Sequence, residues 1–451
     1  MVEQEERTSE RIVDGQLHQY AASSIPYGCI HLLFEQQVKR TPNAVAVVFK
    51  SEQLTYRELN QRSNQLARHL QNRGVGSGML VGICMERSLE LLISTFGVLK
   101  AGGAYLPLDP AHPPEYLNSI VGNSRPVVLL TQERLIAKIL TGPADLLCVD
   151  SEWPVITKES DLNLDLNRAP ESLAYILHSS GKNVMVEHRG IQNRLDWIGK
   201  ELDHWQSDVM LHRSSFASDT SVLEIFWPLL SGSKVVICDS KAESELDDIW
   251  RTIVRQEISV AHFLPSELAA LEELRGRDFA KEASKLRAVL CSGEPMRRLV
   301  TESFLRSFEG DLYYLFGYPE AAAELSLCNC NRDNLKDGVA FYEPTSLPVY
   351  ILDQHLQPVP ICVPGEVYIA GDCISRGYLD NEAETRRSFC DDPFAEFPGE
   401  KMFRTGDLGI RLEDGSIKLD TKANRRYWLK GFRVDLAEIE AALLREPSVE
   451  D

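Results

Sequence analysis

Leu173 to Ile191 read LAYILHSSGKNVMVEHRGI. The apolar run Leu173 to Leu177 predicts a short buried strand, and His178 to Asn183 predicts a small polar turn. From Val184 onward the apolar residues recur at helical spacing, which predicts a helix. A strand, a Ser/Gly turn and a helix start are the ingredients of a phosphate cradle, because free backbone N–H groups at a helix start attract anions. An ordinary strand-to-helix loop is the alternative, since short glycine motifs are weak signals on their own.

Strand-like and helix-like patterns alternate through the N-terminal part of the chain. Such alternation predicts an α/β fold with mixed, largely parallel layers. The predicted helices cover Ile30 to Val38, Leu54 to Leu70 and Arg87 to Lys100, and the predicted strands cover Ala44 to Phe49, Leu80 to Met85, Ala104 to Pro110 and Val127 to Thr131.

The pattern changes at Val349 to short apolar strands separated by Pro, Gly and Asp turns. This part predicts a small distorted β-barrel beside the α/β lobe. Further on, Phe432 to Leu444 has apolar residues at helical spacing, which predicts an amphipathic helix.

Composition is that of an ordinary globular protein. The 451 residues are too many for one compact core, and 43% hydrophobic with 25% charged residues is typical of folded domains. A net charge of −19 argues against a nucleic-acid-binding surface, which needs basic patches. No apolar run reaches the length of a membrane span and no basic-then-apolar leader opens the chain, so we expect a cytoplasmic protein. The ten cysteines are scattered, as expected of reduced and mostly buried thiols.

The sequence around the opening stretch resembles the adenylation domains of nonribosomal peptide synthetases, members of the adenylate-forming ligase superfamily. Val184 to His188 read VMVEH as in that family, and Ser179-Ser180-Gly181 opens its ATP-binding loop TSGSTGxPKG. Lys182-Asn183 stands where that loop closes with Lys-Gly, and the loop centre STGxP is absent. The runs LTYREL and LKAGGAYLPLDP match two further family signatures. The resemblance implies ATP contacts at Ser179, Ser180, Gly181 and Lys182.

The segment Ser214 to Leu230 carries the acid that the family uses for its amino-acid substrate. Asp219 lies among small residues before an apolar helix, where Asp is also a common helix N-cap. In the family this carboxylate pairs with the α-amino group, which offsets the desolvation of both charges. His262 and Glu324 hint at a polar or basic substrate side chain, although each is equally typical of a structural residue. The pocket implied by the resemblance consists of Asp219, Thr220, Leu223, His262, Leu290, Ser292, Leu315, Ala323 and Glu324.

Further ATP contacts are implied at Phe316, Glu320, Asp407 and Lys422. Phe316 takes the place of the aromatic residue that stacks on adenine, and Asp407 takes that of the ribose-binding acid. Lys422 replaces an Arg at the family's hinge. Glu320 takes the place of the acid near magnesium, so ATP and Mg²⁺ are the implied cofactors. The alternative for Glu320 is a solvated surface residue. The alternative for Asp407 is a position in a turn, because Gly-Asp is a common turn sequence.

Several signature positions depart from the family pattern. Tyr318-Pro319 replaces Pro-Thr, which removes a hydroxyl near the phosphates and, through proline, a backbone donor. Phe341 to Pro348 lacks the family's Gly, Arg and Asn, and Asn424 replaces the hinge Asp. A gene that encodes more residues between Gly181 and Lys182 would restore the loop centre and leave these substitutions in place. The chain stops at Asp451, before the position of the family's late catalytic lysine, so no intact catalytic residue is expected.

The resemblance implies a linker or mobile arm over residues 1–26, an adenylation-type core over 27–420, and a hinge with the beginning of a truncated C-terminal lobe over 421–451. Two functions remain open. One is a catalytically impaired domain with an amino-acid ligand, which holds neighbouring condensation and carrier-protein domains and binds an MbtH-like protein. The other is an active ligase that forms aminoacyl-AMP from ATP, loads a carrier protein and obtains its missing lobe from another part of a larger chain. Amino-acid-dependent pyrophosphate exchange discriminates between them.

Overall fold

The computed structural model describes residues 28–139, 142, 144–166, 168–202, 207–239, 246–276, 282–331, 339–341, 345–371, 374–395, 397–419, 426–429 and 432–435. Helices of this part are α2 (Ile30–Arg40), α3 (Tyr56–Asn72), α4 (Leu89–Ala101), α5 (Pro114–Ser124), α6 (Trp153–Ile156), α7 (His188–Glu201), α8 (Asp219–Ser231), α9 (Leu246–Arg255), α10 (Pro265–Arg275), α11 (Arg298–Phe304) and α12 (Glu382–Ser388), with short 3-10 helices η1 (Glu133–Lys138) and η3 (Pro319–Ala321).

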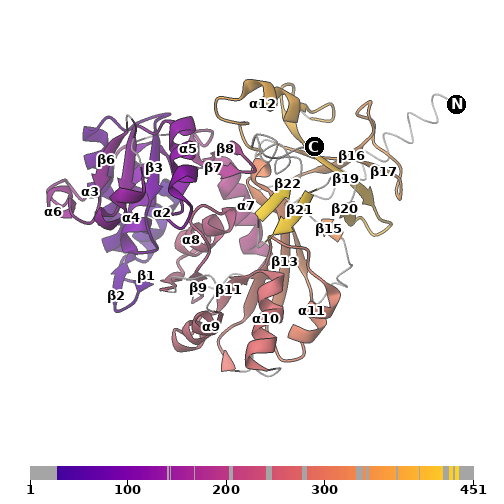
Figure 1. Ribbon diagram of the computed structural model, residues 1–451, viewed down its shortest axis with the longest axis horizontal. Helices are drawn as coiled ribbons and strands as arrows, with labels where there is room; N and C mark the ends of the chain where they lie inside the picture. Colours follow the sequence, from indigo (N-terminus) through magenta and orange to yellow (C-terminus); the bar gives the residue numbers. More distant parts are fainter. Residues whose placement is uncertain are drawn as a thin grey trace, which may run out of the picture.

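Two sheets with parallel centres form most of the molecule (Figure 1). The larger has the strand order β14-β13-β12-β11-β9-β10-β1-β2, and only its two edge pairs are antiparallel. The smaller has the order β6-β5-β3-β4-β7-β8, and only β7 and β8 are antiparallel. The predicted α/β fold with largely parallel layers is confirmed. Strands of the larger sheet are β1 (Val45–Phe49), β2 (Glu52–Thr55), β9 (Val209–His212), β10 (Lys234–Ile237), β11 (Val260–Phe263), β12 (Ala288–Cys291), β13 (Asp311–Tyr318) and β14 (Ala323–Asn329). Those of the smaller are β3 (Leu80–Cys84), β4 (Ala104–Leu108), β5 (Val128–Thr131), β6 (Asp145–Cys148), β7 (Leu173–Ser179) and β8 (Lys182–Glu187).

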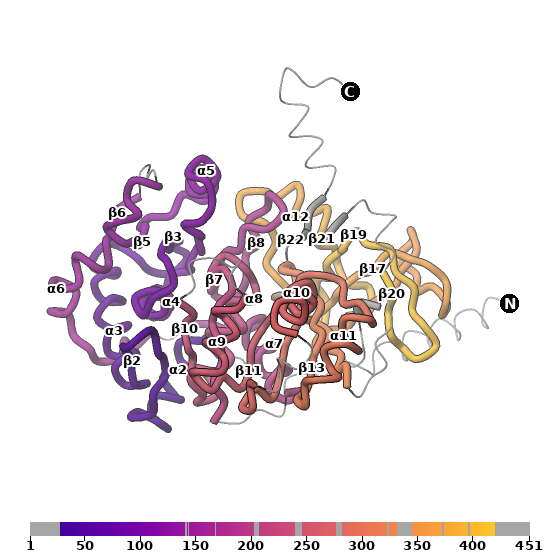
Figure 2. Tube along the Cα trace, turned by 60° about the horizontal axis from the view of Figure 1, so that its bottom comes forward, coloured from indigo at the N-terminus to yellow at the C-terminus, as the bar shows by residue number. Residues whose placement is uncertain are grey.

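Neighbouring residues on the central strands point into different cores. On β10, Val235 packs in the core that contains α2, α3, α4, α7 and α8, whereas Val236 packs with α9, α10 and α11. On β5, Leu130 packs in the first of these cores and Leu129 packs with α5. Because side chains alternate along a strand, helices cover both faces of each parallel sheet. The two sheets therefore enclose one helical layer and carry further helices outside, as Figures 1 and 2 show from two directions.

Local sequence signals explain where helices α3 and α4 begin and where α4 ends. Thr55 and Glu58 form a reciprocal capping box at the start of α3. Ser88 accepts a hydrogen bond from the backbone of Leu91 at the start of α4, and Gly102 ends that helix at a φ of 88°. The helices predicted in these two regions are confirmed, except that Leu54 belongs to β2.

The opening stretch folds differently from our prediction. β7 and β8 form an antiparallel hairpin in which Ser179 pairs with Lys182. Ser180 has a φ of 47° and Gly181 one of 68°, so both residues of the turn are left-handed, as a type I′ turn requires. The backbone N–H groups of the flanking strands therefore belong to a ladder and not to a helix start. The predicted phosphate cradle at a helix start is wrong.

Val184 and the residues directly after it follow the two-residue period of a strand and not the 3.6-residue period of a helix. Val184 and Val186 are buried and Met185 between them is only partly buried, which is the two-residue period of a strand. The α7 helix begins only at His188. Alternation at these three positions was the signal that identifies the second strand of the hairpin.

The β-rich part forms a third, antiparallel sheet with the order β15-β20-β19-β17-β16, to which β18 is added beside β19. Within the described residues the two edge strands β15 and β16 do not pair, so the predicted barrel is an open sheet. The hairpin of the second sheet contacts this part through a hydrogen bond from Met185 N to the Gly377 carbonyl of 2.9 Å. Strands of this sheet are β15 (Val339–Phe341), β16 (Val349–Leu352), β17 (Pro364–Ala370), β18 (Phe389–Asp391), β19 (Lys401–Arg411) and β20 (Ile417–Leu419).

The helix predicted from Phe432 to Leu444 is wrong over its first four residues. β22 (Phe432–Asp435) pairs with β21 (Arg426–Leu429), and aromatic and branched residues in both strands favour this pairing. Residues 436–451 lie outside the described part, as do 1–27 and 420–425. The boundaries 1–26, 27–420 and 421–451 therefore stay predictions.

Two further sequence predictions concern the cysteines and membrane-spanning helices. All cysteines in the described ranges have free thiols, and most of them are buried, as predicted. None of the described helices combines the length and the apolar character that crossing a membrane requires.

Two buried histidines, His31 of α2 and His188 of α7, lie at the contact between these helices. The Ile30 backbone N–H donates to His188 Nδ1 over 3.2 Å, and the His31 ring meets the His188 ring edge-on at 5.6 Å. Burial lowers the pKa of His31 to about 2 and the pKa of His188 to about 3. Both rings are therefore neutral in the folded protein at neutral pH.

We expect the fold to lose stability in mild acid because of these two rings. Below pH 6.5 the unfolded chain binds protons on both histidines and the folded chain does not, so stability present at pH 7.5 is lost as the pH falls. Between pH 7.5 and 5.5 the two together lower the free energy of unfolding by about 3 kcal/mol. Urea denaturation of wild type and His31→Gln at both pH values measures this, and the variant should lose about half of the effect. An equal pH dependence in His31→Gln, with exposed His355→Gln as control, contradicts it.

Candidate functional site

A single cavity of about 840 Å³ contains most of the predicted site residues, and all three sheets contribute to its wall. The parallel strands β11, β12 and β13 end at one edge of the larger sheet, and the carboxyl ends of parallel strands are where α/β proteins bind ligands. The hairpin of β7 and β8 lines another side, and β17, β19 and α12 complete the wall. Representative lining residues are His262, Ser292, Phe316, Ser179, Lys182, Glu384 and Thr405.

The predicted amino-acid pocket is brought together in large part. Leu223 and Leu290 are fully buried in the core and do not reach the cavity. Ala323 lies on β14, where its backbone pairs with Tyr318. The predicted residues that line the cavity are Asp219, Thr220, His262, Ser292, Leu315 and Glu324.

Asp219 is the first residue of α8, and Ser218 is the N-cap. One carboxylate oxygen of Asp219 accepts a hydrogen bond from the backbone of Thr220 over 2.9 Å. An acidic side chain in the first helical turn is favoured by the helix dipole. Asp219 therefore stabilises the helix start and faces the cavity at the same time.

Glu324 lines the cavity and forms a buried ion pair with Arg194 of α7. Burial raises the pKa of Glu324 to about 7, although the positive charge of Arg194 acts in the opposite direction. Sequence analysis missed Arg194, because a single arginine inside a helix pattern is more often a solvated residue. The ion pair could be identified only from the structure, because 130 positions separate the two residues in the chain.

His262 forms a second polar pair in the wall. Its Nε2 lies 2.8 Å from the hydroxyl of Ser292, the residue that follows β12. Burial lowers the pKa of His262 to about 4, so the ring is neutral at neutral pH. The wall beside Asp219 therefore offers neutral hydrogen-bonding groups.

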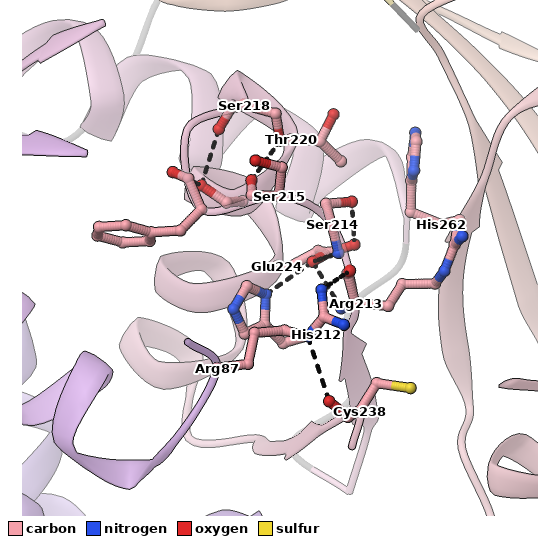
Figure 3. Close-up of polar contacts among 12 residues, drawn as sticks. Arg87, His212, Arg213, Ser214, Ser215, Ser218, Thr220, Glu224, Cys238 and His262 are labelled. Atoms are coloured by element: carbon pink, nitrogen blue, oxygen red, sulfur yellow. Dashed lines mark hydrogen bonds and ion pairs between the residues drawn. The ribbon is translucent and has the colours of Figure 1, made fainter. Parts of the chain in front are cut away.

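A buried network beneath the cavity fixes the loop that leads to α8 (Figure 3). Glu224 of α8 accepts hydrogen bonds from His212 Nδ1 at 2.8 Å, from the backbone of Arg213 at 3.0 Å and from the Ser214 hydroxyl at 2.7 Å. Arg213 donates in turn to both carboxylate oxygens of Glu267, at 2.9 and 2.6 Å. Bidentate pairs of this kind hold a side chain in one orientation. None of these polar residues was predicted from the sequence.

At the predicted nucleotide end of the cavity, polar side chains contact one another. Lys182 Nζ lies 2.6 Å from Glu384 of α12 and 4.9 Å from the centre of the Tyr378 ring. The Tyr378 hydroxyl donates to Glu320 over 2.9 Å. Ser179, Ser180 and Lys182 line the cavity, whereas Gly181 forms the hairpin turn, and ATP contacts at these four residues stay a prediction.

Tyr318 contacts the predicted ribose-binding acid directly. Its hydroxyl donates to Asp407 over 2.6 Å, and both residues are buried. The Phe316 ring meets the Tyr318 ring edge-on at 5.6 Å and lines the cavity. Asp407 is not part of the cavity wall, and Lys422 lies outside the described residues.

Residues 34–379 match a family model described as AMP-binding enzyme. Zwittermicin A synthase ZmaJ of Bacillus cereus is 34% identical over 431 residues, which are 92% of this chain and 80% of that protein. The chain belongs to the AMP-binding enzyme family. The resemblance to nonribosomal peptide synthetase adenylation domains is thereby confirmed.

Larger members of the family contain this unit as one part. Tyrocidine synthase 3 of Brevibacillus parabrevis is 34% identical over 426 residues, and the match spans 93% of this chain and 6% of that protein. A crystal structure of the nonribosomal peptide synthetase FmoA3 in its AMPPNP-bound form has a TM-score of 0.84 and 27% identity, and the match covers 98% of this chain and 46% of that one. The chain thus spans less than half of these two relatives.

Members of the AMP-binding family act on ATP, with which Mg²⁺ is bound. Magnesium at a nucleotide takes one or two carboxylates and completes its shell with waters and phosphate oxygens. Glu320 lines the cavity and accepts a hydrogen bond from Tyr378, which an incoming ion would have to displace, whereas Glu366 and Glu384 are in ion pairs with Arg404 and Lys182. Glu320 is therefore the residue that would hold the ion, which supplies charge neutralisation at the phosphates when bound.

Proposed function

We propose that this chain is an adenylation-like unit of a nonribosomal peptide synthetase that retains an amino-acid pocket but is impaired in the reaction with ATP, and that it serves as a scaffold in the assembly line. One observation carries the proposal. Three side chains expected to contact the nucleotide or its metal are engaged by protein groups: Lys182 by Glu384, Asp407 by Tyr318 and Glu320 by Tyr378.

The hairpin turn supports the impaired reaction. ATP loops hold phosphates with several backbone N–H groups that converge on one point. Here Ser180 and Gly181 form a two-residue turn, and the strands on either side use their backbone groups in pairing with each other. A turn of this length leaves few donors for a triphosphate.

The chemistry explains why these contacts matter. In the family, ATP and an amino acid give aminoacyl-AMP and pyrophosphate, and charge that develops at the α-phosphate must be stabilised by donors, magnesium and a lysine. Removal of one such donor lowers the rate by about 10²–10³-fold in other enzymes, and the effects of several are not additive. With Lys182 and Asp407 engaged elsewhere, ATP must first break two internal polar contacts.

The intact core supports the scaffold role. Buried residues from α2 through β20 form one continuous cluster, so the departures at the nucleotide end coexist with a well-packed fold. The proposed partners are neighbouring condensation and carrier-protein domains and an MbtH-like protein. Interfaces of this kind are moderate in size and partly polar, and the acidic chain suits partners with a basic patch. An active ligase completed by another part of a larger chain is the competing function.

We expect an amino acid to bind without ATP, and its affinity to depend on Asp219. Calorimetric titration with the twenty proteinogenic L-amino acids at neutral pH identifies the best ligand. Asp219→Asn should weaken that ligand by at least about tenfold, because the α-ammonium group loses its anionic partner.

The matched control is Asp145→Asn, which removes a carboxylate from a surface ion pair with Arg73. That variant should bind like wild type. Equal affinity in wild type and Asp219→Asn would reduce Asp219 to a residue that stabilises the start of α8. Loss of binding for the analogue that lacks the α-amino group is the complementary expectation.

A further inference from the structure

Arg194 is a buried cation directly behind the amino-acid pocket. Its side chain is only 2% exposed. The guanidinium group donates to the carbonyl oxygens of Asp219 and Ala322, each over 3.3 Å, and pairs with the Glu324 carboxylate. One side chain thus contacts the backbone of the residue proposed to hold the α-amino group and the more buried acid of the sequence-derived pocket.

The three charged groups form a single electrostatic unit. Arg194 joins the other two, because its guanidinium group contacts the Asp219 carbonyl and the Glu324 carboxylate at the same time. A cation in such surroundings needs its acid, because an unpaired buried charge is strongly unfavourable. Glu324 therefore serves as the counter-ion of Arg194 and is not an unoccupied receptor for a ligand cation.

This pairing decides which side chains the pocket accepts. A lysine or ornithine ammonium group would compete with Arg194 for the same carboxylate, and two cations would then face each other in a poorly solvated space. An acidic side chain would leave its charge without a partner, because Arg194 and Arg213 are already paired with Glu324 and Glu267. The pair of His262 and Ser292 remains as a neutral group that both donates and accepts hydrogen bonds.

We propose that Arg194 is a specificity-determining residue and that, by neutralising Glu324, it restricts the pocket to amino acids with neutral polar side chains. This inference rests on the proposed amino-acid pocket. It narrows the sequence-based expectation of a polar or basic side chain to a neutral polar one.

Calorimetry with L-glutamine, L-threonine, L-lysine, L-ornithine and L-glutamate tests the inference on the full chain. Wild type should bind glutamine or threonine at least about tenfold more tightly than lysine, ornithine or glutamate. Arg194→Met leaves Glu324 without its cation, so the ratio of lysine affinity to glutamine affinity should rise at least tenfold. Glu324→Gln is close in shape to the native residue and should shift the preference the other way, towards glutamate.

Arg287→Met is the matched control, because Arg287 also pairs with a buried acid, Asp208, and this acid, unlike Glu324, does not line the cavity. Its ligand preference should equal that of wild type. A wild type that prefers lysine or ornithine overturns the role of Arg194 and leaves the amino-acid pocket standing. A chain that binds none of the five ligands also overturns the role of Arg194, and one that binds none of the twenty proteinogenic amino acids overturns the pocket itself. If Arg194→Met does not fold, as circular dichroism reports, an unchanged preference in Glu324→Gln still overturns the inference.

Discussion

We expect no amino-acid-dependent pyrophosphate exchange above background from this chain, at least about 10³-fold below an active adenylation domain. Exchange needs an α-phosphate held and neutralised by several groups at once. Here the loop is a two-residue turn, and Lys182 and Asp407 are bound to Glu384 and Tyr318. The assay is run with each proteinogenic amino acid, ATP, Mg²⁺ and labelled pyrophosphate. Clear exchange with any one amino acid would restore the ligase as the function.

A repaired variant makes the negative result informative. Inserting STGxP between Gly181 and Lys182 and changing Tyr318→Pro and Pro319→Thr restores the loop centre and releases Asp407 from the tyrosine hydroxyl. We expect this variant to bind ATP more tightly than wild type in calorimetry, provided that it folds as circular dichroism shows.

We expect deletion of residues 30–451 from a parent synthetase to abolish its peptide product, while point changes in the site leave production nearly unchanged. A scaffold acts through its shape and surface, which deletion removes and Asp219→Ala with Glu320→Ala does not. Product is measured by mass spectrometry of extracts from strains that carry each version.

The comparison separates the two functions sharply. An active ligase requires Asp219 for its substrate and Glu320 for magnesium, so the point changes alone would stop production. If they do, the scaffold role is wrong. Western blots for the parent chain show whether the point variants accumulate normally, so that loss of protein is not mistaken for loss of function.

The sequence alone was enough to predict the α/β class and most of the helices, because these depend on local periodicity and caps. Thr55 with Glu58, Ser88 and Gly102 mark helix ends through contacts within a few residues. It also determined that Asp219, His262, Ser292 and Glu324 belong to one pocket, through a resemblance whose family the comparisons confirm.

The contacts at the nucleotide end and the pairing of charges in the pocket could not be predicted, because they join residues far apart in the chain. The stretch from Val184 to Val186 became a strand because its alternate residues pack in the core beside β7, a choice that its short apolar run left open. Tyr318 reaches Asp407 across 89 positions, and Arg194 reaches Glu324 across 130. Partners so distant in the chain leave no periodic trace, since the contact depends on how three sheets are placed around one cavity. Local pattern therefore determines the elements, and long-range packing determines which side chains remain available to a ligand.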